Sequence, residues 1–191
     1  MSRARVEREL DGLASVAVAW KSLADGVAGM AARYAAVLEG GGTLYFCGNG
    51  GSAADAQHLA AEYLVRYAKT RRPLPAVALT TDTSILTAAA NDFGFEQVFA
   101  RQVEALCRPG DLLVLHSTSG KSPNLLAAAR AARARGAGTV AFLGAGGGPL
   151  VGLVDEAIIV PSNATGRIQV LHLALEHLIV ELVEEALLPT A

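Results

Sequence analysis

Cysteine and excess basic charge are both scarce in this sequence. Among 191 residues there are two cysteines, Cys47 and Cys107, on unlike segments and without a C-x-x-C spacing. This pattern suggests neither a disulfide framework nor a cysteine zinc site, and it favours a reduced, apolar role for each thiol. The formal net charge is -2, whereas a large nucleic-acid footprint would need a basic surface. We therefore expect no nucleic-acid partner, although the net charge leaves a local basic patch open.

Long uncharged apolar segments are missing too. The sequence has no stretch of about 18 uncharged apolar residues, which is the length that a membrane helix needs. Its first residues, MSRARVERELDG, mix charged and apolar side chains, unlike the apolar core of a signal peptide. We therefore expect a soluble, cytoplasmic protein with no membrane partner.

Apolar residues are plentiful over the chain as a whole. The sequence is 52% hydrophobic and 18% charged, which provides enough apolar surface for one well-filled core. We expect a single domain over residues 1–191, with an N-terminal helical segment at 1–38 and an α/β core with a C-terminal helix at 43–188.

Short apolar runs alternate with glycine-rich turns and with longer segments rich in Ala, Leu and Arg. Such runs suit strands buried on both faces, and a segment such as 124–135 is long enough for a crossover helix. The alternation predicts an α/β fold with a doubly wound parallel sheet covered by helices on both sides. The five predicted strands are 43–47, 76–79, 111–116, 139–143 and 157–160.

The C-terminal segment 167–188, RIQVLHLALEHLIVELVEEALL, is apolar on more than one face. Such a helix needs burial against more than one partner, and residues 3–38 are also helical in composition. We expect the terminal helices to pack together and onto a second subunit. The alternative is that they only cover the sheet of their own chain.

A glycine-rich loop, GNGGS, follows the first predicted strand. In doubly wound sheets ligands bind beyond the carboxyl ends of the strands, and Gly48, Gly50 and Gly51 let the backbone turn sharply and approach a ligand. Ser52 is expected to cap the next helix. The loop also matches a dinucleotide fingerprint, but AKTRR at 68–72 replaces the ribose-binding acid expected about 20 residues later. A nicotinamide cofactor is therefore not expected.

A second loop, STSGKS at 117–122, lies between a predicted strand and the helix that Pro123 opens. Its hydroxyls converge with the free N–H groups of a helix N-terminus, which suits a phosphate monoester. A P-loop would need a glycine five residues before Gly120, where Leu115 stands. A triphosphate is therefore not expected. The alternative is a turn that only caps a helix.

His58 and Glu62 are four residues apart on the helix predicted after GNGGS. They lie about 40° apart around the axis and one turn along it, so both can face one metal ion. Arg66 continues this stripe, close enough to pair with Glu62 or to reach an anionic substrate. Taken alone, a His–Glu pair at this spacing is more often a polar contact than a metal site.

Four ordered blocks of the sequence resemble the sugar isomerase (SIS) superfamily, specifically the phosphoheptose isomerases of the sedoheptulose 7-phosphate type. The blocks are CGNGGSAADAQHLAAE, LTTDTSILTAAANDFGF, STSGKSPN and RIQVLHLALEH, and the match runs from about 43 to 185. The resemblance implies a flavodoxin-like domain, usually a homotetramer, with a zinc-dependent aldose–ketose isomerase site between subunits.

The resemblance also implies roles for individual residues. The metal ligands fall on His58, Glu62, Gln169 and His177, with zinc as the ion. Gln169 and His177 are about 12 Å apart along an ideal helix, so sharing an ion needs the side chains to lean together or the helix to break. We assign Glu62 as general base and His177 as general acid, and the two roles could be exchanged.

Substrate contacts are implied on both loops and near Gly94. Asn91 and Asp92 alternatively form only a polar turn before that glycine. His116 is expected to border the phosphate loop and His172 to serve in packing or hydrogen bonding, and neither is assigned to metal. The implied substrate-binding residues are Asn49, Gly50, Gly51, Glu62, Asn91, Asp92, Ser117, Thr118, Ser119, Ser122 and Gln169.

The predicted reaction is an aldose–ketose isomerisation. It needs a base, an acid and an electrophile, and it passes through an enediolate. We expect sedoheptulose 7-phosphate to be converted to D-glycero-D-manno-heptose 7-phosphate with zinc. The alternative is a non-catalytic SIS-domain binding protein that resembles the replication-initiator-associating factor, but that relative lacks equivalents of Glu62 and His177. A third alternative is a sugar-phosphate-sensing regulator. Such regulators generally carry a separate DNA-binding domain, and we expect no room for one in these 191 residues.

Overall fold

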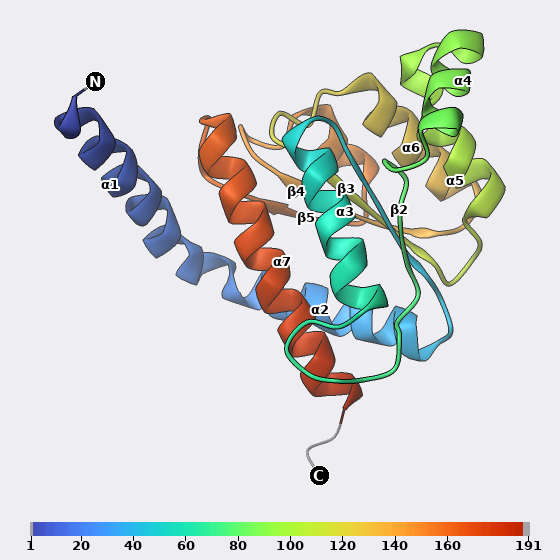
Figure 1. Cartoon of the computed structure of the whole chain (residues 1–191), viewed down its shortest axis with the longest axis horizontal. Helices are drawn as coiled ribbons and strands as arrows, with labels where there is room; N and C mark the ends of the chain where they lie inside the picture. Colours follow the sequence, from blue (N-terminus) through green and yellow to red (C-terminus); the bar gives the residue numbers. More distant parts are fainter. Residues whose placement is uncertain (1, 189–191) are drawn as a thin grey trace.

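The structure is a computed structural model that describes residues 2–188, and its centre is a five-stranded parallel sheet (Figure 1). Each strand falls on one of the predicted apolar runs, with small shifts at the ends. The strand order is β2-β1-β3-β4-β5, which is the flavodoxin-like order. The predicted doubly wound sheet is therefore confirmed. The strands are β1 (Leu44–Gly48), β2 (Ala76–Ala78), β3 (Leu112–Ser117), β4 (Gly138–Leu143) and β5 (Glu156–Ile159).

Helices precede, connect and follow the strands. The predicted N-terminal helical segment is divided by a short 3-10 helix, and the C-terminal segment forms one unbroken helix. The α-helices are α1 (Arg3–Ala19), α2 (Ala24–Glu39), α3 (Gly51–Leu64), α4 (Thr83–Phe93), α5 (Ala100–Leu106), α6 (Pro123–Ala134) and α7 (Thr165–Leu187), and the 3-10 helices are η1 (Trp20–Leu23), η2 (Phe95–Gln97) and η3 (Gly148–Leu153).

The sheet is buried on both faces because side chains alternate in direction along each strand. In β3, Leu112 and Val114 belong to the core that α2, α3 and α7 cover. Leu113 and Leu115 belong to the opposite core, which α5 and α6 cover. Every residue of β1 and β3 is buried. This two-sided burial explains why these strands form continuous apolar runs in the sequence.

Both cysteines are buried thiols of the core on the α5 and α6 side. Burial raises the pKa of the Cys47 thiol and, with Asp111 nearby, raises the pKa of Cys107 to about 12. Because the thiolate is the reactive form, both side chains act as small apolar groups, as the sequence predicts.

The two ends of the chain pack differently. α2 lies along α7 in a common core, whereas α1 extends away from the body of the molecule (Figure 1). Arg167 Nη2 and Glu9 Oε2 form an ion pair of 2.7 Å that links α7 to α1, and Val6, Leu10 and Val18 of α1 stay exposed. The terminal helices thus pack together through α2 and α7, and their packing onto a second subunit remains a prediction.

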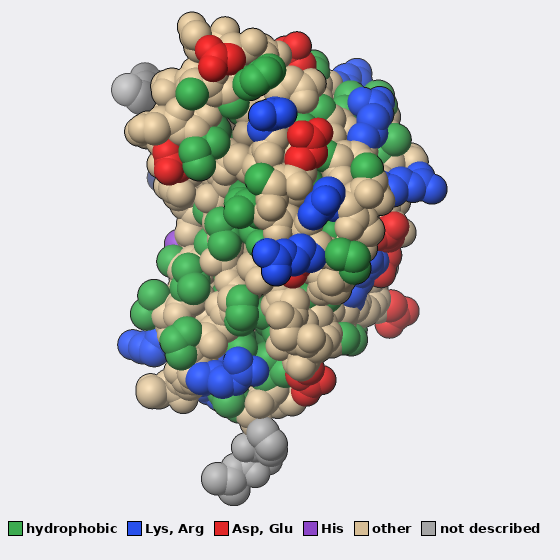
Figure 2. Space-filling model, turned by 90° about the vertical axis from the view of Figure 1, so that its right-hand side faces the viewer, with side chains coloured by type: hydrophobic (Ala, Val, Ile, Leu, Met, Phe, Trp, Pro, Cys, Tyr) green, Lys and Arg blue, Asp and Glu red, His purple; other side chains and the backbone are tan. Residues whose placement is uncertain are grey.

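Apolar side chains also reach the surface beyond α1. Phe93 of α4, Phe95 of η2 and Leu106 of α5 are exposed. On the face of the molecule shown in Figure 2, hydrophobic side chains are scattered between acidic and basic ones. None of the helices within residues 2–188 is long and apolar enough to cross a membrane.

Candidate active site

The glycine-rich and serine-rich loops leave the sheet side by side. β1 and β3 are neighbours although β2 comes between them in sequence, and Gly48 of β1 pairs with His116 of β3. This is the switch point at which doubly wound sheets bind ligands. The two loops and the start of α7 enclose a pocket of about 280 Å³. Its lining residues are Asn49, Gly50, Gly51, Ser52, His116, Ser117, Thr118, Ser119, Ser122, Thr165 and Gln169.

This pocket brings together the predicted substrate-binding residues of both loops with Gln169 of α7. The sequence analysis missed Thr165, which lies at the first position of α7 and adds another hydroxyl to the lining. No sequence pattern could place it there, because only the tertiary fold brings the start of α7 to the loops. A lining of hydroxyl groups beside helix N-termini suits a phosphate group.

Close neighbours at Gly48 and Gly51 and a positive φ at Gly50 favour glycine in the first loop. A Cβ on Gly48 would lie 2.5 Å from the Ser52 carbonyl oxygen, and one on Gly51 would lie 2.6 Å from Gln169 Nε2. Gly50 has a φ of 56° and is the N-cap of α3, so the helix begins before Ser52. The predicted capping role of Ser52 is therefore wrong, since this residue is already inside the first turn and buried.

The serine-rich loop uses its hydroxyls as acceptors from its own backbone. The Gly120 N–H donates to Ser117 Oγ at 3.0 Å, and the Lys121 N–H donates to Ser119 Oγ at 3.3 Å. Each hydroxyl keeps its own proton to donate. Pro123 opens α6 as predicted, but the N-cap Ser122 makes no side-chain capping bond to any described residue. Helix capping alone therefore does not account for these hydroxyls.

Two amides connect the loops across the pocket wall. Asn49 Nδ2 donates to Asn124 Oδ1 at 2.9 Å, and Asn124 Nδ2 donates back to Asn49 Oδ1 at 2.8 Å. Asn124 is buried at the start of α6. The paired amides hold Asn49 in one orientation beside the serine-rich loop.

Three potential metal ligands meet between α3 and α7. His58 Nε2 lies 2.9 Å from His177 Nε2 and 3.2 Å from Glu62 Oε1. The ligand atoms of all three lie within 4.8 Å of one another. Two imidazole nitrogens and a carboxylate oxygen are ordinary zinc donors, so this donor set fits a divalent ion. The arrangement places the predicted base and acid, Glu62 and His177, at one point of the fold.

Gln169, the fourth predicted ligand, has a different environment. Its side chain packs against Gly51 and lines the pocket. Because α7 is unbroken, Gln169 and His177 are about 12 Å apart along the axis, and the broken helix considered from the sequence is excluded. A role of Gln169 as metal ligand remains a prediction.

Arg66 does not continue the stripe of His58 and Glu62. α3 ends at Leu64, and Arg66 lies beyond it, where its Nη1 donates to the Tyr67 carbonyl oxygen at 3.3 Å. The prediction that helical spacing aligns Arg66 with Glu62 is therefore wrong, because the helix stops first.

Asn91 and Asp92 lie in the last turn of α4, exposed and outside the pocket lining of their own chain. Asn91 Nδ2 donates to Asp92 Oδ1 at 2.7 Å. Asp82 caps this helix, and Gly94, with a φ of 89°, ends it. The two residues are thus helical and do not form a turn, and a substrate contact of these two residues remains a prediction.

A buried acid–imidazole pair lies directly under the pocket. His116 Nε2 and Glu176 Oε1 are 2.9 Å apart, and both side chains are 0% exposed. The Tyr34 hydroxyl donates to the same oxygen at 3.4 Å. Burial raises the pKa of the Glu176 carboxyl, although the His116 contact lowers it. The sequence analysis missed this pair, for which the only signal was an acid on the apolar face of 167–188.

His172 is buried beside this pair and donates from Nε2 to the Leu143 carbonyl oxygen at 3.1 Å. Burial, with His116 nearby, lowers the pKa of His172 to about 3. The side chain is therefore neutral at physiological pH, and its predicted role in packing and hydrogen bonding is confirmed.

Comparison with known proteins gives consistent results. The SIS domain family model matches residues 12–144. The phosphoheptose isomerase of Roseiflexus sp. (strain RS-1) is 55% identical over 161 residues, covering 84% of this chain and 82% of the relative. Among solved structures, the phosphoheptose isomerase of Neisseria gonorrhoeae has a TM-score of 0.90 and 39% identity, covering 95% of this chain and 98% of that one.

A second solved phosphoheptose isomerase, from Francisella tularensis, has a TM-score of 0.91 and 32% identity, with 97% of this chain and 99% of that chain covered. These similarities extend over most of the chain. The chain therefore belongs to the SIS-domain family and, within it, to the phosphoheptose isomerases, which are sugar-phosphate isomerase enzymes.

Proposed function

We propose that the chain converts sedoheptulose 7-phosphate to D-glycero-D-manno-heptose 7-phosphate in a zinc-assisted reaction. The observation that supports this most is the meeting of His58, Glu62 and His177 on two helices that both start at the hydroxyl-lined pocket. The names of the relatives point to a phosphorylated heptose as substrate.

The separation between the pocket and this cluster suits a seven-carbon sugar phosphate. His58 follows Gly51 along α3, and His177 follows Gln169 along α7, so both lie roughly 10–12 Å from the pocket along their helices. An extended seven-carbon chain with a terminal phosphate spans roughly 10 Å, given C–C bonds of about 1.5 Å. A phosphate in the pocket would therefore leave the first two carbons near the cluster.

The serine-rich loop would hold the phosphate. The hydroxyls of Ser117, Thr118, Ser119 and Ser122 donate to phosphate oxygens, and the N-terminus of α6 adds its positive dipole end. The phosphate is distant from the reacting carbons, so its binding energy serves to orient the substrate. Asn49, held by Asn124, would contact the sugar hydroxyls.

Glu62 and His177 would carry the proton transfers. One side chain removes the carbon-bound proton beside the carbonyl, which gives an enediolate, and the other delivers a proton to the neighbouring carbon or oxygen. We assign the base to Glu62 and the acid to His177, and the opposite assignment uses the same geometry. When bound by His58, Glu62 and His177, with Gln169 as the proposed fourth ligand, zinc supplies Lewis-acid polarisation of the substrate oxygens.

Asn91 and Asp92 are proposed to contact the substrate of a neighbouring subunit. Their exposure on α4, outside the pocket of their own chain, supports this. The proposal requires an oligomer, for which a homotetramer is the expected form.

The decisive test is the conversion of sedoheptulose 7-phosphate by wild type and Glu62→Gln side by side. Glu62→Gln keeps the size of the side chain and removes its basicity, so turnover should fall about 10² to 10⁴-fold while the fold persists. Glu181→Gln makes the same change at an exposed position of α7 and serves as the matched control. Elemental analysis should find about one divalent ion per active site.

Three outcomes would contradict the proposal. Full activity in protein without metal would show that zinc has no part in the reaction. Equal turnover in wild type and Glu62→Gln, or none in zinc-loaded wild type, would favour the non-catalytic binding protein.

A further inference from the structure

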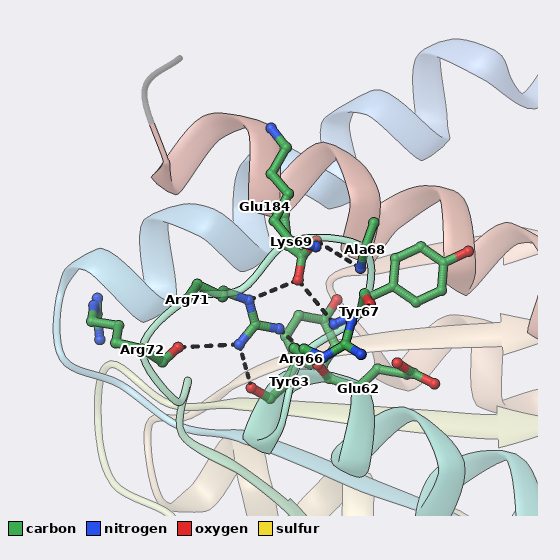
Figure 3. A network of polar contacts seen from close by, with 9 residues as sticks. All are labelled: Glu62, Tyr63, Arg66, Tyr67, Ala68, Lys69, Arg71, Arg72 and Glu184. Carbon is green, nitrogen blue, oxygen red and sulfur yellow. Dashed lines mark hydrogen bonds and ion pairs between the residues drawn. The ribbon is translucent and has the colours of Figure 1, made fainter. Parts of the chain in front are cut away.

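A single carboxylate on α7 holds the segment that follows α3 (Figure 3). Glu184 Oε1 accepts from the Tyr67 N–H at 3.0 Å and from Arg71 Nε at 2.8 Å. Its Oε2 accepts from the Ala68 N–H at 3.0 Å and the Lys69 N–H at 2.9 Å. Three consecutive amides around one anion form a backbone nest. This segment of 65–75 therefore has a defined path although it contains no regular helix or strand.

Arg71 connects the same carboxylate to the end of α3. Its Nη1 donates to the Tyr63 carbonyl oxygen and its Nη2 to the Glu62 carbonyl oxygen, each at 2.7 Å. Carbonyls in the last turn of a helix lack intrahelical partners, so Arg71 satisfies two of them. The side chains of Arg71 and Glu184 are 0% and 1% exposed. The ion pair therefore ties α3, which carries His58 and Glu62, to α7.

The Glu184 carboxylate is strongly satisfied despite its burial. Burial by itself raises the pKa of this carboxyl, but the amides of Tyr67, Lys69 and Ala68, together with Arg71, lower the pKa below its ordinary value. A buried carboxylate with this many donors stays charged, and removing one partner of such a pair is costly.

Tyr67 carries this arrangement to the proposed active site. Its ring stacks on the His177 imidazole with centroids 5.2 Å apart and planes at 16°. His177 also has an edge contact with the His58 ring, at 5.1 Å and 71°. Rotation of the His177 ring would break the first contact and move Nε2 away from His58. The orientation of a ligating imidazole is commonly set by such neighbouring groups.

We propose that Tyr67 is a positioning residue that fixes the orientation of the His177 imidazole, and that the Glu184–Arg71 ion pair holds Tyr67 in place. The inference rests on the proposed function, because His177 is the ligand and acid in that scheme. Glu184 follows His177 by two helical turns and so lies on the same face of α7. One helix face therefore carries both the functional imidazole and the anchor of the residue that orients it.

The first test measures the orientation itself in metal-free protein. The chain has four histidines, so a sample labelled at histidine Cε1 gives few NMR signals, and His177→Ala identifies the relevant one. A stacked aromatic ring shifts this signal upfield. The shift should persist in Tyr67→Phe, which keeps the ring, and disappear in Tyr67→Leu. The same upfield shift in Tyr67→Leu as in wild type would overturn the proposal.

The second test measures the consequence for the site. Zinc titration of metal-free protein against a chelating indicator should show about 10 to 100-fold weaker binding in Tyr67→Leu and wild-type binding in Tyr67→Phe. With sedoheptulose 7-phosphate, kcat should fall while KM changes little, because the phosphate pocket is separate. Lys69→Ala is the control, since Lys69 contacts Glu184 through its backbone N–H. Wild-type zinc affinity and kcat in Tyr67→Leu would overturn the proposal.

The third test addresses the anchor. Arg71→Lys keeps the charge but loses the planar fork that reaches Glu184 and two carbonyls together, so the His177 signal should lose part of its upfield shift. An unchanged signal would refute the anchoring role. If Arg71→Lys does not fold, the Tyr67 variants still decide the positioning role. If wild type neither binds zinc nor isomerises the sugar, the proposed function fails, whereas the metal-free signal still shows whether Tyr67 orients His177.

Discussion

Removal of Glu176 alone should destabilise the protein, whereas removal of Glu176 together with His116 should not. The two side chains form a fully buried pair with 2.9 Å between Nε2 and Oε1. The His116 ring stacks between Phe46 and Phe142, at centroid distances of 6.3 and 5.3 Å. The surroundings are thus aromatic, and they offer a polar group little compensation if its partner is lost.

The expected magnitude follows from the contacts that would be broken. Glu176→Leu leaves both nitrogens of the His116 imidazole unbonded, because Nδ1 already has no partner among the described residues. It also removes the 3.4 Å contact of the Tyr34 hydroxyl. An unsatisfied buried polar group costs about 1–3 kcal/mol, and this variant leaves two nitrogens and one hydroxyl without a partner. We expect the free energy of unfolding to fall by about 3 kcal/mol, or roughly 6–12 °C in Tm.

The double variant His116→Phe/Glu176→Leu replaces both polar groups by apolar groups of similar size. Its free energy of unfolding should lie within about 1 kcal/mol of wild type or above it. Glu176→Gln keeps a hydrogen-bonding group, so its free energy of unfolding should lie between those of Glu176→Leu and the double variant. Thermal unfolding of metal-free protein, followed by circular dichroism at one protein concentration, separates these outcomes because association would make Tm depend on concentration. Losses that simply add in the double variant would refute the reasoning.

Two further predictions concern the pocket and the buried histidine beside it. Ser119→Ala and Ser122→Ala should each weaken substrate binding by about 1 kcal/mol while the protein remains folded, and unchanged dissociation constants would indicate a purely structural loop. His172 is neutral when folded, with its pKa lowered from 6.5 to about 3, so the unfolded chain takes up the proton first on acidification. The contribution of His172 to the free energy of unfolding should be complete above about pH 6.5 and decrease as the pH falls toward 3. The decrease should be shallower in His172→Gln, which keeps an N–H donor. Equal slopes of unfolding free energy against pH in the two proteins, measured by denaturation from pH 7 to pH 4, would contradict this.

Local patterns predicted the elements of the fold well. The five strands were visible because parallel strands buried on both faces are continuous apolar runs, as in β1 and β3. The serine-rich loop and the start of α6 at Pro123 were also visible, since turn and helix-start preferences depend on neighbouring residues. The predictions for Ser52 and Arg66 were wrong because they assumed incorrect ends for α3. Each depended on where α3 begins and ends, which Gly50 and the segment after Leu64 decide.

The sequence by itself determined which segments become strands and helices, and through its resemblance to a family it indicated the residues of the candidate site. Only the tertiary structure decided which of these residues meet. His58 and His177 are 119 positions apart, and their contact depends on how α3 and α7 pack on one face of the sheet. The pairs His116–Glu176 and Arg71–Glu184 were invisible for the same reason. Side-chain periodicity reports the burial of a residue, but the identity of its partner is set by long-range packing that no local pattern encodes.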